Sequence, residues 1–235
     1  TDGDINTTST SVNTVSKFSV SKYTGTGSNA TIGHGLGVVP KVIIFKRLDS
    51  ADDWTVYHAS KGATYKIDLN NANAATQVAT VFNNTAPTSS LMTVGTNGRT
   101  NASGGTYLVY AFADVPGYSR FGMYTGNSSA MSDSFDAPFI YTGFKPSTVI
   151  IKGVGANGRD WYIWNNKNLG YNPDNNELYP SDNSAEGTAD KIYLMSNGFK
   201  LNHSGTGVNS NGEEYVYMAW GQTMVGSNNV PCTAR

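Results

Sequence analysis

The sequence predicts an all-β protein, an antiparallel β-sandwich of jelly-roll or lectin-like type built from two tandem repeats, and three observations indicate it. Short runs rich in β-branched and aromatic residues alternate with clusters of Gly, Asn, Ser and Asp, as is typical of strands joined by turns. Asn-Gly pairs at 97–98, 157–158, 197–198 and 211–212 favour tight hairpin turns, because both residues tolerate a positive φ angle. Five blocks of sequence recur in the same order about a hundred residues apart, which indicates an internal duplication.

The repeated blocks place the expected strands. In the first repeat we expect strands at 18–23, 41–46, 54–58, 64–69 and 107–112, with counterparts in the second. Trp54 and Trp161 each follow an Asp and begin an equivalent β-patterned run, so we expect both rings in the core. The matched blocks are 23–25 with 124–126, 40–46 with 146–152, 53–57 with 160–164, 91–92 with 194–195, and 101–112 with 209–220.

One stretch has helical spacing, with Ala75, Val78, Ala79 and Phe82 at i, i+3, i+4 and i+7. Asn and Thr flank it and compete for helical backbone hydrogen bonds. We therefore expect a strand or loop there.

The repeats define the expected domain organisation. Repeat 1 covers 18–114 and repeat 2 covers 118–222, followed by a C-terminal tail, 223–235, while residues 1–17 are expected to form a linker or an N-terminal arm. One repeat alone would leave an apolar face open, so we favour a single sandwich that both repeats build over 18–235. The alternative is two small sandwiches in series, with the boundary near 115–117.

Composition excludes several classes of protein. Charged residues are 14% of the chain and the net charge is −1, which offers no basic surface for nucleic acid or an anionic membrane. The longest apolar run, 107–113, is far shorter than the ~20 residues of a membrane span, so no membrane insertion is expected. The first residues lack the pattern of a secretory signal, and the lone Cys232 forms no disulfide within the chain.

Eight short blocks carry a resemblance to a known module, and these are 33–44, 53–58, 85–90, 143–146, 170–174, 178–179, 196–201 and 225–235. Together they resemble a repeat module of unknown function that is found in virion structural proteins of marine tailed phages, including cyanophages. The resemblance covers about residue 18 to the end and implies a surface component of a virion, such as a fibre, an appendage or a capsid decoration. It implies no catalytic residue.

The sequence gives little sign of catalysis or of a cofactor, and we expect neither an enzyme nor a metal site. A glycosidase needs two opposed carboxylates, but Glu is scarce, and the recurring Asp53 and Asp160 suit turn caps. His34 stands between glycines as a turn residue, and no histidine pair has metal-ligand spacing. Calcium at 174–177 and 182–184 stays open, although the spacing is not that of an EF-hand.

A ligand surface, if the chain has one, is expected in the segment 164–179 of the second repeat. Aromatic rings beside amide groups can stack on a sugar ring while bonding its hydroxyls. The corresponding part of the first repeat is poorer in both kinds of residue. The alternative is that Trp164 belongs to the core, like its counterpart Tyr57, and that the tyrosines fix a long loop. The expected ligand-binding residues are Trp164, Tyr171, Asn172, Asp174, Asn175 and Tyr179.

The resemblance thus implies a structural protein of a tailed-phage virion. Together with the candidate ligand segment, it leads us to expect a module of a fibre or appendage that binds host-surface glycan. Its expected partners are other virion proteins and copies of itself, with a trimer favoured. A capsid decoration or cement protein is the first alternative, and a secreted glycan-active enzyme is the second.

Overall fold

The computed structural model of the chain describes residues 3–130, 136–168, 172 and 174–221. It divides into two compact units, Thr1–Asn70 with Ala75–Asp114 and Asn71–Ala74 with Val115–Arg235. Every pair of named strands is antiparallel, and the two helices of the described residues have four residues each. The all-β prediction is therefore confirmed. No helix in the described part is long and apolar enough to cross a membrane.

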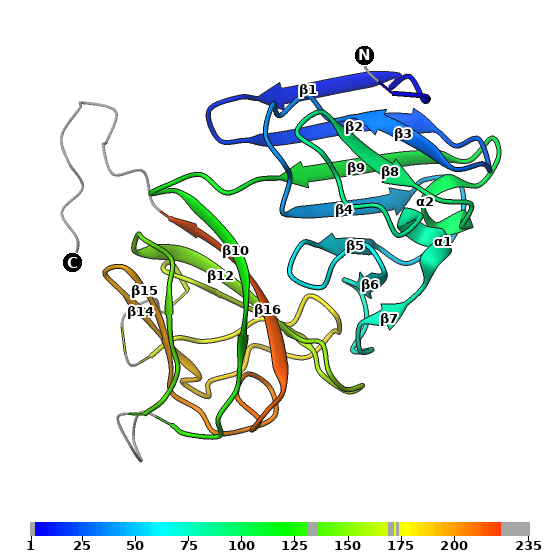
Figure 1. The fold of residues 1–235 in the computed structure, drawn as a ribbon. Coiled ribbons are helices and arrows are strands. Elements are labelled where there is room, and N and C mark those ends of the chain that lie inside the picture. The colour runs from blue at the N-terminus through cyan, green and yellow to red at the C-terminus, as the bar shows by residue number, and fades with distance from the viewer. Residues whose placement is uncertain (1–2, 131–135, 169–171, 173, 222–235) are drawn as a thin grey trace. The chain divides into compact units, whose positions relative to one another are not determined.

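The first unit has a seven-stranded sheet in the order β1-β2-β9-β4-β5-β6-β7, with a second layer made of the β3–β8 pair and the two helices (Figure 1). In β9 every second side chain is buried, so Tyr107, Val109 and Ala111 face the core, where they join Ile32 of β3 and Phe82 of α1. The elements are β1 Ser9–Asn13, β2 Phe18–Thr24, β3 Ala30–Gly33, β4 Val42–Arg47, β5 Thr55–His58, β6 Tyr65–Asp68, β7 Thr76–Gln77, α1 Ala79–Phe82, β8 Leu91–Val94, α2 Gly98–Asn101 and β9 Thr106–Phe112.

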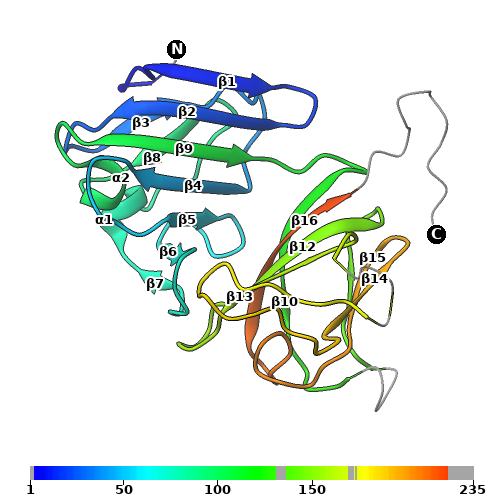
Figure 2. The same cartoon turned by 180° about the vertical axis from the view of Figure 1, so that it is seen from behind.

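The second unit has a four-stranded sheet in the order β10-β16-β12-β13 and a three-stranded sheet in the order β11-β15-β14 (Figures 1 and 2). Its core joins Val149, Ile151 and Tyr217 of the larger sheet to Ile140 and Phe199 of the smaller one. The strands are β10 Ser119–Thr125, β11 Phe139–Tyr141, β12 Pro146–Gly153, β13 Trp161–Asn165, β14 Ile192–Met195, β15 Gly198–Leu201 and β16 Glu214–Gly221.

The expectation that both repeats share one sandwich core over 18–235 is corrected by this division. Each unit has its own core, because a smaller layer from the same unit covers the apolar face of its main sheet. The units divide between Asp114 and Val115, next to the boundary of the alternative arrangement.

The two main sheets have the same strand order when strands are matched by the recurring sequence blocks. β2-β9-β4-β5 in the first unit corresponds to β10-β16-β12-β13 in the second. Tyr23 stacks on Tyr107 with ring centroids 5.1 Å apart, and Tyr124 stacks on Tyr215 at 5.2 Å.

The hydrogen bonds of the stacked tyrosines also match. The Tyr107 hydroxyl accepts from the Ala102 N–H and donates to the Gly98 carbonyl. The Tyr215 hydroxyl likewise accepts from the Ser210 N–H and donates to the Thr206 carbonyl.

One of the matched blocks, Leu91-Met92 with Leu194-Met195, is wrong. Met92 lies opposite Ile32 in the β3–β8 pair, whereas Ile140 of β11 lies opposite Phe199 of β15. β15 therefore takes the place of β8, and β14 is an additional strand that forms a hairpin with β15.

Residues before the first repeat are part of the first unit, and the expectation of a linker or arm over 1–17 is wrong for most of this segment. β1 pairs with β2 along its whole length, and the Ile5 side chain is buried in the first core. The Asp4 carboxylate accepts hydrogen bonds from the backbone N–H and the hydroxyl of Thr31. The expected tail, 223–235, lies outside the described residues.

Two further expectations need correction. Residues 79–82 form one helical turn, α1, where a strand or loop was expected. Trp161, the first residue of β13, is fully buried, whereas Trp54 precedes β5 and is half-buried, with its ring stacked on Tyr110 at 6.2 Å. The recurring tryptophans thus differ in burial.

Candidate functional site

The predicted ligand segment, 164–179, is in large part engaged in packing. Trp164 is fully buried on the core face of β13, where its ring stacks on Tyr162 with centroids 5.7 Å apart. Its indole Nε1 has no hydrogen-bond partner among the described residues. Tyr171 lies outside the described residues, so the structure does not place it.

Two predicted ligand residues bind the edge of β14. The side chain of Asn172 pairs with Leu194 as a backbone peptide would, since its Nδ2 donates to the Leu194 carbonyl and its Oδ1 accepts from the Leu194 N–H, both at 3.0 Å. Asn175 is buried, and its Nδ2 donates to the Ile192 carbonyl at 2.9 Å and to Asn172 Oδ1 at 2.7 Å. The exposed Asp174 lies between them. These amides therefore satisfy backbone groups that an edge strand would otherwise leave open.

Tyr179 belongs to a buried polar cluster that the sequence reasoning missed. Its hydroxyl lies 3.0 Å from Oε1 of Glu177, a fully buried carboxylate that also forms an ion pair with Lys191. The Lys191 ammonium lies 4.9 Å from the centroid of the Tyr162 ring. Burial raises the pKa of Tyr162 to about 12, and burial together with Glu177 raises the pKa of Tyr179 still further, so both hydroxyls stay protonated at neutral pH.

Backbone geometry brings Glu177 to this position. Glu177 forms an antiparallel bridge with Gly187, and a Cβ atom on Gly187 would lie 2.4 Å from both the Glu177 carboxylate and the Tyr179 hydroxyl. A larger residue at this position would therefore have to displace the Glu177 carboxylate and the Tyr179 hydroxyl. Fourteen residues separate Glu177 from Lys191, so no local spacing in the sequence signals the pair.

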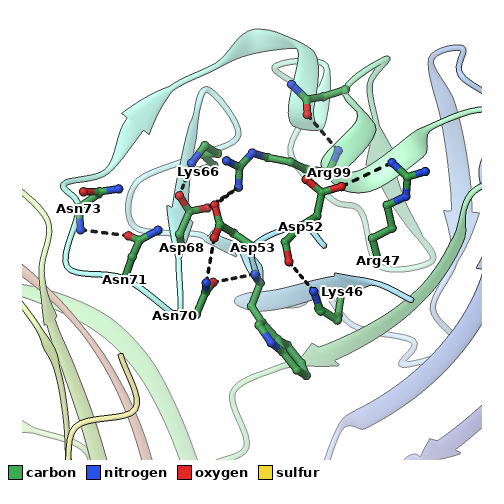
Figure 3. A network of polar contacts seen from close by, with 12 residues as sticks. Lys46, Arg47, Asp52, Asp53, Lys66, Asp68, Asn70, Asn71, Asn73 and Arg99 are labelled. Carbon is green, nitrogen blue, oxygen red and sulfur yellow. Dashed lines mark hydrogen bonds and ion pairs between the residues drawn. The ribbon is translucent and has the colours of Figure 1, made fainter. Parts of the chain in front are cut away.

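A second polar cluster lies in the first unit around Arg99 (Figure 3). The Arg99 Nη1 lies 2.7 Å from Asp53 Oδ2 and 3.2 Å from Asp68 Oδ1, and Lys66 binds the other oxygen of Asp68. Asn70 donates to Asp53 Oδ1 at 2.8 Å. This hydrogen bond and the nearby Arg99 hold the pKa of Asp53 below its usual value.

The recurring aspartates act as tethers, where turn caps were expected. Asn70 links the Asp53 carboxylate to the backbone N–H of Trp54, and Ser181 links the Asp160 carboxylate to the backbone N–H of Trp161. Each Asp therefore helps to fix the beginning of the strand that follows it.

His34 also has structural partners, as do Asn175 and Glu177 among the candidate calcium ligands. His34 is fully buried; its Nδ1 accepts from the Leu36 N–H, so its Nε2 carries the proton and donates to the Thr88 carbonyl at 3.1 Å. Glu177, the acidic end of the segment 174–177, is bound by Lys191. Within the described residues no group of three or more His, Cys, Asp or Glu side chains could hold a metal ion.

Comparisons with known proteins give one family. A family model described as a domain of unknown function, DUF7483, matches residues 1–223. No curated protein matches the chain. A solved structure, the major capsid protein P2 from bacteriophage PM2, aligns with a TM-score of 0.23 and 9% identity, over 85% of this chain and 94% of that chain. A TM-score of this size supports no inference about fold or function.

Proposed function

The chain belongs to the DUF7483 family, a domain of unknown function, and we propose that it is a non-enzymatic structural module on the surface of a tailed-phage virion that contacts host-surface glycan. The virion location is supported by the sequence blocks that resemble virion structural proteins. The non-enzymatic part of the proposal rests on one observation. The carboxylates of both polar clusters form ion pairs within the fold.

Glycoside hydrolysis requires a protonated acid and a second carboxylate with the sugar between them. Asp53 and Asp68 are close in space, but both contact the same Arg99 nitrogen, so a guanidinium occupies the position that the sugar would need (Figure 3). The lowered pKa of Asp53 also keeps that group ionised at neutral pH. Glu177 is buried against Lys191. Polysaccharide cleavage that is lost on mutation of one Asp or Glu would contradict this part of the proposal.

We also infer that the two units are copies of one ancestral unit. The shared strand order, the two stacked tyrosine pairs and the matching tyrosine hydroxyl bonds support this inference. A further match involves Asn101 and Asn209, which are both fully buried and accept the N–H of Thr26 and Asn127, respectively. A duplicated scaffold of this kind suits a protein whose role is to present surfaces.

The experiment that tests the proposal is electron microscopy of purified phage particles labelled with antibodies against the chain. Label on a fibre or an appendage would support the proposal. Label over the capsid would favour the decoration alternative, and particles without label would contradict the virion role. Sedimentation of the full chain tests the expected trimer.

A further inference from the structure

We propose that the outward face of the β11-β15-β14 sheet is the surface that contacts glycan. This inference rests on the proposed glycan-binding function and gives it a location outside the segment 164–179. The residues on this face are Phe139 and Tyr141 of β11, Lys200 of β15, and Tyr193 and Met195 of β14, with Asn197 in the turn between β14 and β15.

Strand register defines the face. Ile140, Phe199, Leu201, Ile192 and Leu194 point into the core of the second unit, so the alternate residues of the same strands point outward. Phe139 and Tyr193 lie on either side of Lys200, and Tyr141 and Met195 lie on either side of Gly198. The outward side of this sheet therefore carries two rows of large side chains.

Exposure shows that this face is accessible in the chain. Tyr141 is 65% exposed, Phe139 45% and Met195 36%. These three exposed side chains share one face of the sheet with Lys200. A rigid sheet supports all of them, and the core on its inner side fixes their spacing.

Gly198 lies between Tyr141 and Met195 and is buried. A Cβ atom at this position would lie 2.1 Å from the Ile140 carbonyl oxygen and 2.9 Å from Cζ of Phe139, so glycine lets the Phe139 ring lie close over the backbone here. Two strand spacings place Tyr141 roughly 10 Å from Met195, and the exposed face of the Tyr141 ring is where a sugar ring would stack. The backbone N–H of Thr142 donates to the Asn197 carbonyl at 3.0 Å, which holds the exposed residue Asn197 beside the end of β11. An aromatic ring beside an amide can stack on a pyranose and bond its hydroxyls.

The size of the face favours a sugar over a protein. Three strands of three or four residues have a footprint of roughly 200 Å², whereas a stable protein interface needs about 800 Å² from each partner. A few sugar units match this footprint. The outward residues of the three strands include no carboxylate, so the expected glycan is neutral or anionic.

The first unit lacks this face. On its β3–β8 pair the outward positions hold Thr31 opposite Thr93 and Gly33 opposite Leu91. The Thr31 hydroxyl is bound by Asp4. The aromatic face is thus present in one of two units whose main sheets have the same strand order, as expected for a feature that function requires and packing does not.

The test is calorimetric titration of the full chain with cellohexaose, laminarihexaose, chitohexaose and a mannuronate hexamer. The double variant Phe139→Thr, Tyr141→Thr should bind the best of these at least tenfold more weakly, with only a small change in melting temperature because Tyr141 is 65% exposed and Phe139 45%. The matched control is Val39→Thr, Leu48→Thr, which removes two exposed apolar side chains from the first unit and should bind like the wild type.

The outcomes separate the two proposals. Equal binding by wild type and the β11 variant would overturn this location and leave glycan binding in place. Absence of binding by the wild type to all four sugars and to host cells would overturn glycan binding and this inference together. Self-association of the wild type that the β11 variant abolishes would assign the face to a contact between copies and overturn its role in glycan binding.

Discussion

In both units an Asp carboxylate, through one bridging side chain, fixes the start of the corresponding strand, but the charged groups in the two units differ. In the first unit the Asp53 tether lies beside a partly exposed cluster around Arg99, whereas in the second unit the charged pair Glu177–Lys191 is buried. The stacked tyrosines and the strand order are shared, while the charged clusters and the second layers differ. The stacked tyrosine pair and the order of four strands are therefore the same in both units, whereas each unit covers its main sheet in its own way.

The sharpest test of this difference uses the recurring tryptophans. Trp161→Ala should destabilise the protein by about 3 to 5 kcal/mol, because the ring is fully buried. Trp54→Ala should cost less than about 2 kcal/mol, because that ring is half-buried against Tyr110. Urea unfolding followed by circular dichroism measures both, and equal losses would show that the two positions are equivalent in packing.

Removing the Asn172 side chain from the edge of β14 should cause a smaller loss of stability, and it directly checks the sequence-based ligand prediction. Asn172→Ala leaves the N–H and the carbonyl of Leu194 without their partner and should cost about 1 to 3 kcal/mol. Asp174→Ala, at an exposed neighbouring position, is the matched control and should change stability by less than about 0.5 kcal/mol.

Hydrogen exchange at the Leu194 amide reports the edge itself and should become faster in the Asn172→Ala variant. If that variant keeps its stability and its slow exchange but loses glycan binding, then Asn172 is a ligand residue and the edge role is wrong.

Local patterns in the sequence predicted much of the fold and little of the polar clusters. The run of β-branched and aromatic residues over 107–112 predicted β9, and the Asn197-Gly198 pair predicted the β14–β15 turn. β1 was missed because Ser and Thr dominate its sequence and leave Val12 as its one large apolar residue. Asn172 was assigned to a ligand because composition shows that an amide is present but does not show that the edge of β14 occupies it.

The charged clusters escaped prediction for a different reason. Glu177 and Lys191 are 14 positions apart, with Gly187 packed against the carboxylate, and Arg99 reaches Asp53 across 46 positions of sequence. The aromatic face of β11 was overlooked because Phe139 and Tyr141 are two residues in a three-residue strand, too short for a pattern of their own. The face is recognised only from the strand pairing, which places Lys200 of β15 and Tyr193 and Met195 of β14 on the same side as these two residues.

The smallest expected effect is the pH dependence that His34 gives the first unit. Burial lowers the pKa of His34 below its ordinary value of about 6.5, so the unfolded chain binds a proton more readily than the folded one. The stability from the neutral ring is therefore fully present above pH 6.5 and is lost as the pH falls below that value. His34→Gln keeps a donor for the Thr88 carbonyl. Between pH 7.5 and 5.5 the free energy of unfolding should fall less in this variant than in the wild type, and the two falls should differ by less than about 1 kcal/mol.

Burial also lowers the pKa of His203 in the second unit, with Lys191 adding to the effect, so the variant should keep part of the acid sensitivity. Urea unfolding at the two pH values measures the difference, and an unchanged pH dependence in the variant would show that the buried ring of His34 does not account for acid sensitivity.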